Sequence, residues 1–286
     1  RNLNPPDENS IKIAGFLVEF LEHEQKYGRL PQEMLPIQSG VGSIANAVLM
    51  GLSQSKYENL KMYSEILQDA VFSLIKIGKV SQASGCAFTP SPNVWQMYKE
   101  NPDLYRKSIV LRPLDISNNP EIIRRLGVIS INTPLEFDIY GQANSTHVMG
   151  ASMMNGIGGS GDYMRNGYLT IFCTPSTAKK GSISSVVPMV THADHTEHDT
   201  MVFITEQGIA DIRGLPPVKR AKLIIEKCAH PDYKAQLLEY LQQAQRKNAH
   251  MPVDLTHAFD MQAHYAAQQQ LLDTTIKATR EEDYHG

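Results

Sequence analysis

The sequence is poor in cysteine, and it has neither a long apolar run nor a strong excess of charge of one sign. Its three cysteines, Cys86, Cys173 and Cys228, are far apart and form no C-x-x-C pair, so neither a disulfide framework nor a zinc ribbon is indicated. No apolar run approaches the roughly 18 residues that a membrane span needs. The formal net charge of -3 argues against a general surface for nucleic acid or anionic membranes. Any anionic ligand must therefore be bound by local groups.

The length and composition are those of a globular protein. With 286 residues, of which 42% are hydrophobic and 20% charged, the chain can bury a substantial core. The few, scattered cysteines fit a reducing compartment, so we expect a cytoplasmic protein, or one of the mitochondrial matrix if the source is eukaryotic.

Short strands alternate with helices along the first two thirds of the chain. Helical spacing of apolar residues predicts a first helix over 11–21, with Ser10 as its N-cap. Two strand, turn and helix units follow, in which strands at 35–38 and 60–63 run into the turns at Ser39–Ser43 and Ser64–Glu65. The helices of these units are expected at 44–52 and 66–77, and another at 94–105. Further strands are predicted at 109–111, 128–132, 135–140, 145–148, 169–173, 184–187 and 201–205. The pattern predicts an α/β fold with a mixed, largely parallel sheet flanked by helices.

A helical tail follows the strands. Apolar periodicity predicts helices over 221–228, 233–246 and 259–272, and the polar segment 278–286 is expected to be disordered. We therefore divide the chain into an α/β domain, residues 1–225, and a tail, residues 226–286, that packs on the core.

The segment Asn155 to Tyr163, NGIGGSGDY, places four glycines within six residues. Gly156, Gly158 and Gly161 satisfy the G-x-G-x-x-G pattern of dinucleotide binding, but that pattern needs a strand before it, a helix after it and an acidic residue about 20 positions on. Here Lys179 and Lys180 lie at that distance. The glycines must therefore serve another purpose. They present bare backbone that a ligand or a reacting atom can approach very closely.

Two carboxylates stand at strand ends, where α/β folds place ligands. Glu65 follows the strand at 60–63, and it is either a general base or nucleophile, or an acid that merely favours the start of a helix. Glu206 follows the strand at 201–205, and it is either functional or a turn residue. The Gly40 to Ile44 turn, at a helix start, offers backbone N–H groups to a phosphate.

Three histidines, His192, His195 and His198, recur every third residue in THADHTEHD. Catalytic zinc pairs on helices use a spacing of four, so a metal is the weaker interpretation and a hydrogen-bonded loop that shapes the site is the stronger one. We assign no metal. Lys179 and Lys180 either hold a phosphate or simply solvate the surface. Met149, Met153 and Met154 are expected in the core.

Taken together, several motifs in order resemble the acetyl-CoA hydrolase/transferase family, the class I CoA-transferases, and in particular its C-terminal domain of the succinyl-CoA:acetate type. The resemblance covers nearly the whole chain. It rests on SGVGSIANAV from Ser39, YSEILQDAV from Tyr63, DIYGQANSTHVMG from Asp138, the glycine segment, VPMVTHADHTEHDT from Val187 and TEQGIADIRGL from Thr205. By this resemblance the family's N-terminal domain, of similar size, is absent from the chain.

The resemblance implies a covalent mechanism. The glutamate matching Glu65 attacks an acyl-CoA, and a glutamyl-CoA thioester follows, which an acceptor carboxylate then opens. Gly159, by its match, donates its backbone N–H to the oxyanion, while Asn118 and Glu206 match positions that line the reacting groups. The CoA itself, a substrate rather than a tightly bound cofactor, is implied to lie along residues that match the family's binding site, namely Gly40, Val41, Gly42, Ser43, Ile44, Leu135, Asn155, Gly159 and Lys179.

The resemblance leaves three functions open. The first is a CoA-transferase that moves CoA between short-chain acids, with acetate as acceptor or product. The second is an acetyl-CoA hydrolase that uses the same intermediate, and the third is a CoA-binding domain without catalysis, because the missing half would close the acyl pocket. The implied partners are an acyl-CoA, a short-chain carboxylate, the N-terminal domain and a second copy in a homodimer, with no nucleic acid and no membrane.

Overall fold

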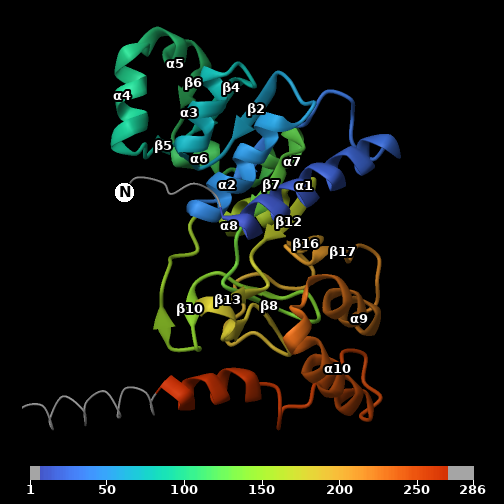
Figure 1. Ribbon diagram of the computed structural model, residues 1–286. Helices are drawn as coiled ribbons and strands as arrows, with labels where there is room; N and C mark the ends of the chain where they lie inside the picture. The colour runs from blue at the N-terminus through green and yellow to red at the C-terminus, as the bar shows by residue number, and fades with distance from the viewer. Residues whose placement is uncertain (1–6, 270–286) are drawn as a thin grey trace, which may run out of the picture.

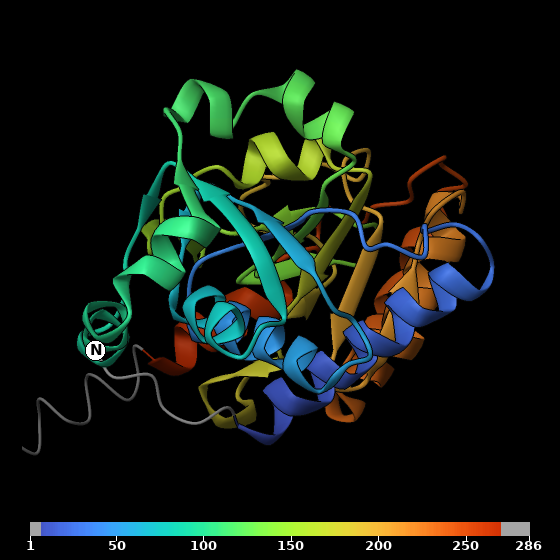
Figure 2. The ribbon, with the colours of Figure 1, turned by 90° about the horizontal axis from the view of Figure 1, so that it is seen from above.

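The computed structural model describes residues 7–269, and an eight-stranded sheet forms their centre (Figures 1 and 2). All neighbouring strands in it are parallel except β16 and β17, which form an antiparallel edge pair. In spatial order the strands are β17 (Gly208–Asp211), β16 (Val202–Thr205), β12 (Leu169–Cys173), β7 (Ile129–Asn132), β1 (Ile37–Ser39), β2 (Leu60–Tyr63), β4 (Val80–Gly85) and β6 (Ile109–Leu111). The predicted α/β fold with a mixed, largely parallel sheet is confirmed.

Helices cover both faces of this sheet (Figure 2). On one face α1 (Glu8–Lys26), α2 (Ser43–Gly51) and α3 (Asp69–Lys76) bury apolar side chains against β1, β7 and β12 in the larger core. On the other face lie α7 (Pro120–Leu126) and α8 (Ser160–Asn166), where Ile123 and Tyr163 pack with Tyr63. Burial of these apolar faces, at about 25 cal/mol per Å² removed from water, is the main force that fixes the layers.

Three smaller sheets, which contain β8 (Glu136–Asp138), β10 (His147–Val148) and β13 (Thr177–Ala178), lie below the main one in Figure 1. The strands predicted at 135–140 and 145–148 do not form a hairpin with each other: β8 pairs antiparallel with β9 (Ala143–Asn144), and β10 pairs with β11 (Ser152–Met153). The strand predicted at 184–187 is two, β14 (Ile183–Ser184) and β15 (Val186–Val187), which pair with β13 and β8 respectively.

Three local predictions are wrong in instructive ways. The N-cap of α1 is Asp7, whose carboxylate accepts the Ser10 N–H at 2.8 Å. The helix predicted at 94–105 is broken into α4 (Pro92–Glu100) and α5 (Pro102–Ser108), because Asn101 precedes a proline and leaves the helical region. The helix predicted from residue 66 starts at Asp69, since Ile66–Leu67 is the short strand β3, which pairs with β5 (Ala87–Phe88). Glu65 is therefore not an acid at a helix start.

The C-terminal part is helical, as predicted, in α9 (Pro217–Cys228), α10 (Pro231–Gln245) and residues 260–269. The first two pack with Phe172 and Phe203 of the sheet in a second core. The boundary drawn between residues 225 and 226 falls inside α9, and the division into domain and tail stays a prediction. The rest of the helix predicted at 259–272, and the segment 278–286, lie outside the described residues.

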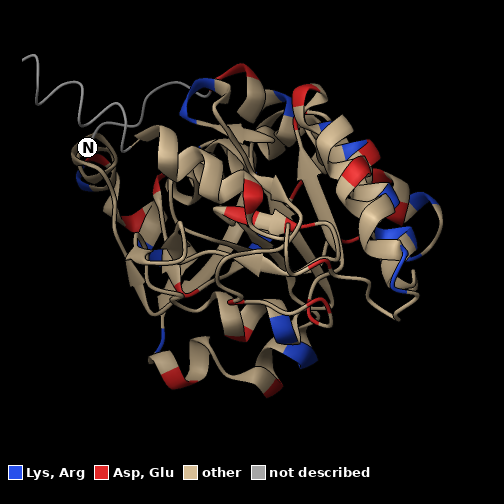
Figure 3. Cartoon of the chain, turned by 90° about the horizontal axis from the view of Figure 1, so that it is seen from below, with Lys and Arg blue, Asp and Glu red and all other residues tan. Residues whose placement is uncertain are grey.

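Charges of both signs are mixed over the face seen from below in Figure 3. Within α1, Lys12 pairs with Glu8 at 2.7 Å, and Glu24 of the same helix pairs with Arg29, which follows it, at 2.7 Å. No helix within residues 7–269 has the length and apolar character needed to cross a membrane.

Candidate active site

Glu65 and Gly159 meet at the carboxyl edge of the main sheet. A Cβ atom added to Gly159 would lie 2.0 Å from Oε2 of Glu65, so only glycine leaves room for the carboxylate. The Gly159 N–H has no acceptor among residues 7–269. A half-buried carboxylate thus lies beside a free backbone donor on a buried residue.

Asn118 is the third member of this group. It follows α6 (Leu114–Ser117), and its side-chain amide donates to Glu65 Oε2 at 3.4 Å and to Asp162 Oδ2 at 3.1 Å. Its amide oxygen is buried without a partner within the described part of the chain. The structure therefore brings three of the four predicted catalytic residues together.

The segment around Glu65 is fixed by its backbone. The Glu65 carbonyl accepts the Cys86 N–H at 2.7 Å, which ties it to the loop after β4. Burial, and to a lesser extent the Glu65 carboxylate, raise the pKa of the Cys86 thiol. The preceding residues also have clear roles, because Tyr63 donates from its hydroxyl to the Ile116 carbonyl at 2.7 Å and Ser64 accepts the Ser39 N–H at 2.9 Å.

The Gly40 to Ile44 turn lies between β1 and α2, next to Glu65. Gly42 has a φ of 120°, a conformation that favours glycine. The Gln68 side chain holds the turn at both ends: its nitrogen donates to the Gly40 carbonyl at 2.8 Å and its oxygen accepts the Gly42 N–H at 3.0 Å. Gln68, which the sequence did not single out, therefore links the predicted CoA turn to the segment that carries Glu65.

A buried polar network supports the site from beneath. The Gln38 oxygen accepts from Ser130 at 2.6 Å and from the Asn132 amide at 2.9 Å, and the Gln38 amide donates to Asn132 Oδ1 at 3.2 Å. These side chains come from the neighbouring strands β1 and β7. Because every bond is internal, the network holds the strand ends in register.

The group opens into a pocket of about 120 Å³. Two of its lining residues, Val41 and Ile157, are exposed apolar residues, and Met153 and Met154 nearby in the chain are 70% and 65% exposed. The prediction of Met153 and Met154 as core residues is wrong, because β11 belongs to an exposed two-stranded ribbon. The pocket is lined by Gln38, Ser39, Gly40, Val41, Glu65, Ile66, Asn132, Gly156, Ile157, Gly158, Gly159, Ser160 and Tyr163.

Six of the nine residues implied for CoA lie outside this lining, namely Gly42, Ser43 and Ile44 of the turn, and Leu135, Asn155 and Lys179. Asn155 is exposed and donates from its side chain to the Ser145 carbonyl at 3.3 Å. Leu135 is half-buried, with its N–H bonded to the Asn144 carbonyl at 2.8 Å. Lys179 is exposed at the start of the 3-10 helix η2 (Lys179–Gly181), so it is accessible to an anion.

The structure does not bring Glu206 to Glu65. It follows β16, four strands from β2, so at about 4.8 Å per strand roughly 19 Å separates the two strand ends. Its carboxylate accepts the N–H of Ser176 at 2.7 Å, the Ser176 hydroxyl and the Gln207 amide at 3.0 Å. These bonds fit a role in holding the loop after β12.

The three histidines do not point to one place. His195 is buried beside Phe172, whereas the side chain of His198 is 82% exposed and that of His192 is 44% exposed. Within residues 7–269 no group of three or more His, Cys, Asp or Glu side chains is placed to hold a metal ion. The loop is instead hydrogen-bonded, as Asp194 accepts the Ser145 N–H at 2.7 Å and the Thr146 hydroxyl at 2.8 Å.

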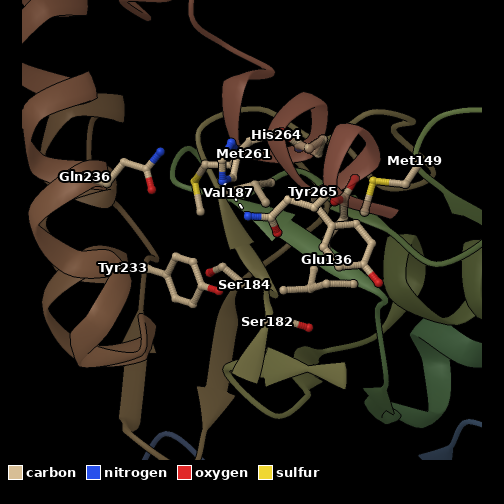
Figure 4. A pocket seen from close by; sticks show the side chains of 13 residues that line it. Glu136, Met149, Ser182, Ser184, Val187, Tyr233, Gln236, Met261, His264 and Tyr265 are labelled. Atoms are coloured by element: carbon tan, nitrogen blue, oxygen red, sulfur yellow. Dashed lines mark hydrogen bonds between the residues drawn. The ribbon is translucent and has the colours of Figure 1, made fainter. Parts of the chain in front are cut away.

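A larger cavity of about 390 Å³ lies elsewhere, between β8, β14, α10 and residues 260–269 (Figure 4). Glu136 and Tyr265 face it, and none of the predicted site residues lines it. The Glu136 carboxylate accepts from Asn144 and Thr191 at 2.8 to 2.9 Å through one of its oxygens. This cavity is therefore separate from the group around Glu65.

Comparison with known proteins identifies relatives of this arrangement. The chain is 60% identical over 235 residues to the succinyl-CoA:acetate CoA-transferase of Clostridium kluyveri, covering 82% of the chain and 44% of that protein. It is 54% identical to the propanoyl-CoA:succinate CoA transferase of Escherichia coli and 48% identical to the acetyl-CoA hydrolase of Candida albicans, covering 87% and 91% of the chain and 51% and 52% of those proteins. The chain thus spans about half the length of the curated relatives it matches.

The solved structures agree with this fold. RipA from Yersinia pestis superposes with a TM-score of 0.72 at 26% identity, over 87% of this chain and 55% of that one. The model of the acetyl-CoA hydrolase/transferase C-terminal domain matches residues 95–241, just over half of the chain. The chain therefore belongs to the acetyl-CoA hydrolase/transferase family.

Proposed function

We propose that this chain is the part of a CoA-transferase that carries the nucleophile and the CoA site, and that the enzyme moves CoA between a short-chain acyl-CoA and a carboxylate such as acetate. The observation that carries the proposal is the contact between the Glu65 carboxylate and Gly159, whose N–H is free within residues 7–269. An attacking carboxylate and an oxyanion donor are the two groups that acyl transfer from a thioester requires.

The proposed reaction begins when a Glu65 oxygen attacks the acyl-CoA carbonyl, which expels the CoA thiolate and leaves an acyl-glutamyl anhydride. The thiolate then attacks the glutamyl carbonyl of the anhydride, releasing the first acid as its carboxylate and forming the Glu65–CoA thioester. The acceptor carboxylate attacks this thioester, giving a second anhydride and thiolate. Finally the thiolate attacks the new acyl carbonyl, which yields the new acyl-CoA and restores Glu65.

Each of these steps passes through a tetrahedral oxyanion. In our proposal the Gly159 N–H donates to it, and the loss of such a donor typically raises a barrier by about 3 kcal/mol. Asn118 holds Oε2 of Glu65, the carboxylate oxygen next to Gly159, through its 3.4 Å contact. Its bond to Asp162 keeps the amide oriented.

We assign CoA binding to the Gly40 to Ile44 turn at the start of α2, which offers backbone N–H groups to an anion. Leu135, Asn155 and Lys179 are proposed to extend this site along the CoA molecule, with the exposed Lys179 near the phosphates. CoA acts here as a substrate, and no metal or tightly bound cofactor is part of the proposal.

The relatives' greater length supports a partner for this chain, the family's N-terminal domain. Exposed apolar residues beside the pocket, among them Val41 and Ile157, fit a surface that such a partner covers. We further propose a homodimer, and a cytoplasmic or mitochondrial-matrix location, which the three free cysteines support.

The second candidate, acetyl-CoA hydrolysis through the same thioester, is favoured by relatives named as hydrolases. Consumption of acetyl-CoA and appearance of free CoA, both measured with and without succinate, separate the two. A transferase consumes acetyl-CoA only when the second carboxylate is present. If CoA release needs no acceptor and no acceptor changes it, the hydrolase is the correct function.

The covalent step is tested in the full-length native protein. Incubation with acetyl-CoA followed by sodium borohydride should reduce the Glu65–CoA thioester to an alcohol and inactivate the enzyme. Glu65→Ala should have almost no activity and take up no CoA, detected by intact mass after acid quenching. The exposed carboxylate variant Glu121→Ala, which loses only its pair with Arg125, should behave as the wild type. If the wild-type protein forms no covalent adduct with CoA, the remaining function is that of a CoA-binding domain without catalysis.

A further inference from the structure

His195 makes a hydrogen bond that reaches the glycine segment. Its side chain is buried, with a residue exposure of 2%, and Nε2 lies 3.2 Å from the Ser160 hydroxyl. Ser160 directly follows Gly159, and its hydroxyl donates to the Ile157 carbonyl at 2.8 Å. A hydroxyl can donate only one hydrogen bond. Because the Ser160 hydroxyl donates to the Ile157 carbonyl, its oxygen can only accept a hydrogen bond from His195. With the Ser160 hydroxyl bonded to Ile157, the contact with His195 is a hydrogen bond in the tautomer that has its proton on Nε2.

The imidazole is held in place independently of the glycines. The His195 backbone forms an isolated bridge with Ala143, with N–H to carbonyl distances of 2.9 and 3.1 Å in the two directions. Its ring packs against Phe172 with centroids 5.1 Å apart. Burial lowers the pKa of His195, and nearby Asp194 and Asp199 only partly oppose this, so the ring is neutral at pH 7.

The chain of bonds ends at the candidate oxyanion donor. The Ile157 carbonyl, which accepts the hydrogen bond from Ser160, lies at the start of the tight turn formed by Ile157, Gly158 and Gly159. That turn brings the backbone of Gly159 to the Glu65 carboxylate, where a Cβ would overlap Oε2. A group that sets the turn therefore sets the position of the Gly159 N–H.

We propose that His195 is a positioning residue, which holds the backbone of Gly159 beside the Glu65 carboxylate by donating to Ser160. The inference rests on the proposed function, in which the Gly159 N–H stabilises the oxyanion. It gives a role to one histidine of the His192, His195 and His198 series and leaves the other two in the surface loop. Displacement of an oxyanion donor slows the chemical step, whereas the binding of CoA at the Gly40 turn does not depend on it.

The test measures the rate at which acetyl-CoA forms the Glu65–CoA adduct in the full-length native protein, by quenched intact mass, together with the Kd of CoA. We expect His195→Ala to slow the adduct about tenfold, the effect of one lost hydrogen bond, with the Kd changed less than about twofold. His195→Gln should recover most of the rate, because the glutamine amide can donate where Nε2 does. Ser160→Ala should slow the adduct like His195→Ala, and the double variant should be no slower than either single variant.

His198→Ala is the matched control, because this side chain is in the same loop and 82% exposed, and it should leave the rate unchanged. If His195→Ala does not fold, Ser160→Ala and His195→Gln still decide the question. Wild-type rates in His195→Ala or Ser160→Ala overturn the inference while leaving the proposed function intact. The inference is also overturned if His195→Gln is as slow as His195→Ala, because the volume of the ring, and not its hydrogen bond to Ser160, would then be what matters. A wild-type protein that forms no adduct overturns both.

Discussion

Gly159→Ala probes the contact on which the proposed chemistry depends. The backbone of Gly159 has φ of -78° and ψ of -1°, which alanine adopts without strain. The added Cβ would lie 2.0 Å from Glu65 Oε2 and 2.7 Å from Asn118 Nδ2, whereas ordinary contacts begin at 3.4 Å. Both clashes involve ends of side chains rather than the backbone. The variant should therefore fold, with the Glu65 carboxylate pushed more than an ångström from its present position.

The expected consequence is kinetic. A misplacement of about 1 Å between reacting groups can cost roughly 100-fold in rate, and removal of an oxyanion donor costs about 100- to 1000-fold. We expect formation of the Glu65–CoA adduct from acetyl-CoA to slow at least about 100-fold, as measured by quenched-flow mass spectrometry. The Kd of CoA, measured by calorimetry, should change less than about threefold, and the melting temperature should change little, because the Gly40 turn and the core are untouched.

Gly161→Ala is the matched control. It lies two residues further along the same segment, inside α8, and its added Cβ would meet only Ile157 Cδ1 at an ordinary 3.6 Å. Alanine also favours the helix by up to about 1 kcal/mol, so this variant should keep its rate and melt slightly higher. The reasoning is refuted if Gly159→Ala weakens CoA binding as much as it slows the adduct, because a general collapse of the turn then explains both.

Three further outcomes are expected. Gln68→Ala removes both bonds that hold the Gly40 to Gly42 turn, so the Kd of CoA measured by calorimetry should rise about tenfold; an unchanged Kd would place CoA elsewhere. Gly51→Ala puts a Cβ 2.5 Å from the Ala14 Cβ where α1 and α2 cross, and should lower the free energy of unfolding in urea by about 1–3 kcal/mol. Gly15→Ala, whose Cβ meets nothing within 4 Å, is its control and should not destabilise. His195 has a lowered pKa in the folded state, so below pH 6.5 the unfolded chain binds more protons and stability falls as the pH falls; His195→Gln should remove this part of the acid slope, and an identical slope in both proteins would contradict it.

Much of the site could be predicted because parallel strands carry their carboxyl ends to one edge. Glu65 and the Gly40 turn lie at that edge, and each has a local signal, a strand followed by Gly, Ser or an acid. The glycine segment, which lines the same pocket, has a different signal, its clustered glycines. The same logic failed for Glu206, which also follows a strand. Strand order, which no local pattern encodes, places it four strands away.

The errors near Glu65 have a local cause. Ile66 and Leu67 satisfy helical spacing with Val71 and Leu74, so a helix from residue 66 was the natural prediction. The two residues pair with β5 instead, and the helix begins only at Asp69. The better signal was the acidic Asp69, which favours the positive end of a helix.

The contacts that sequence could not supply are those between side chains and distant backbone. The Gln68 amide spans 28 residues to Gly40, and the Ser64 hydroxyl spans 25 residues to Ser39. Neither residue type is unusual in its position, and the partner is decided by strand register alone. His195 is similar: the sequence predicts a hydrogen-bonded loop around it, but its contacts with Phe172 and Ser160 come from distant parts of the chain.

The backbone around the pocket is held by hydrogen bonds, whereas two apolar side chains of its lining are exposed, and this difference bears on acyl specificity. The bonds between Ser64 and Ser39 and between Gln68 and Gly40 join the segment of the nucleophile and the CoA turn into one hydrogen-bonded unit. The side chains of Val41, in that turn, and of Ile157, in the glycine segment, remain exposed. If the acyl group lies against these two side chains, then the nucleophile belongs to this chain while the choice of acid depends on what covers them. Changes to Val41 or Ile157 should therefore alter the differences in KM between acids of different length more than they alter the rate of CoA uptake by Glu65. The reason is that these two side chains would contact the acyl group, the part of the substrate that varies, whereas Glu65 would not.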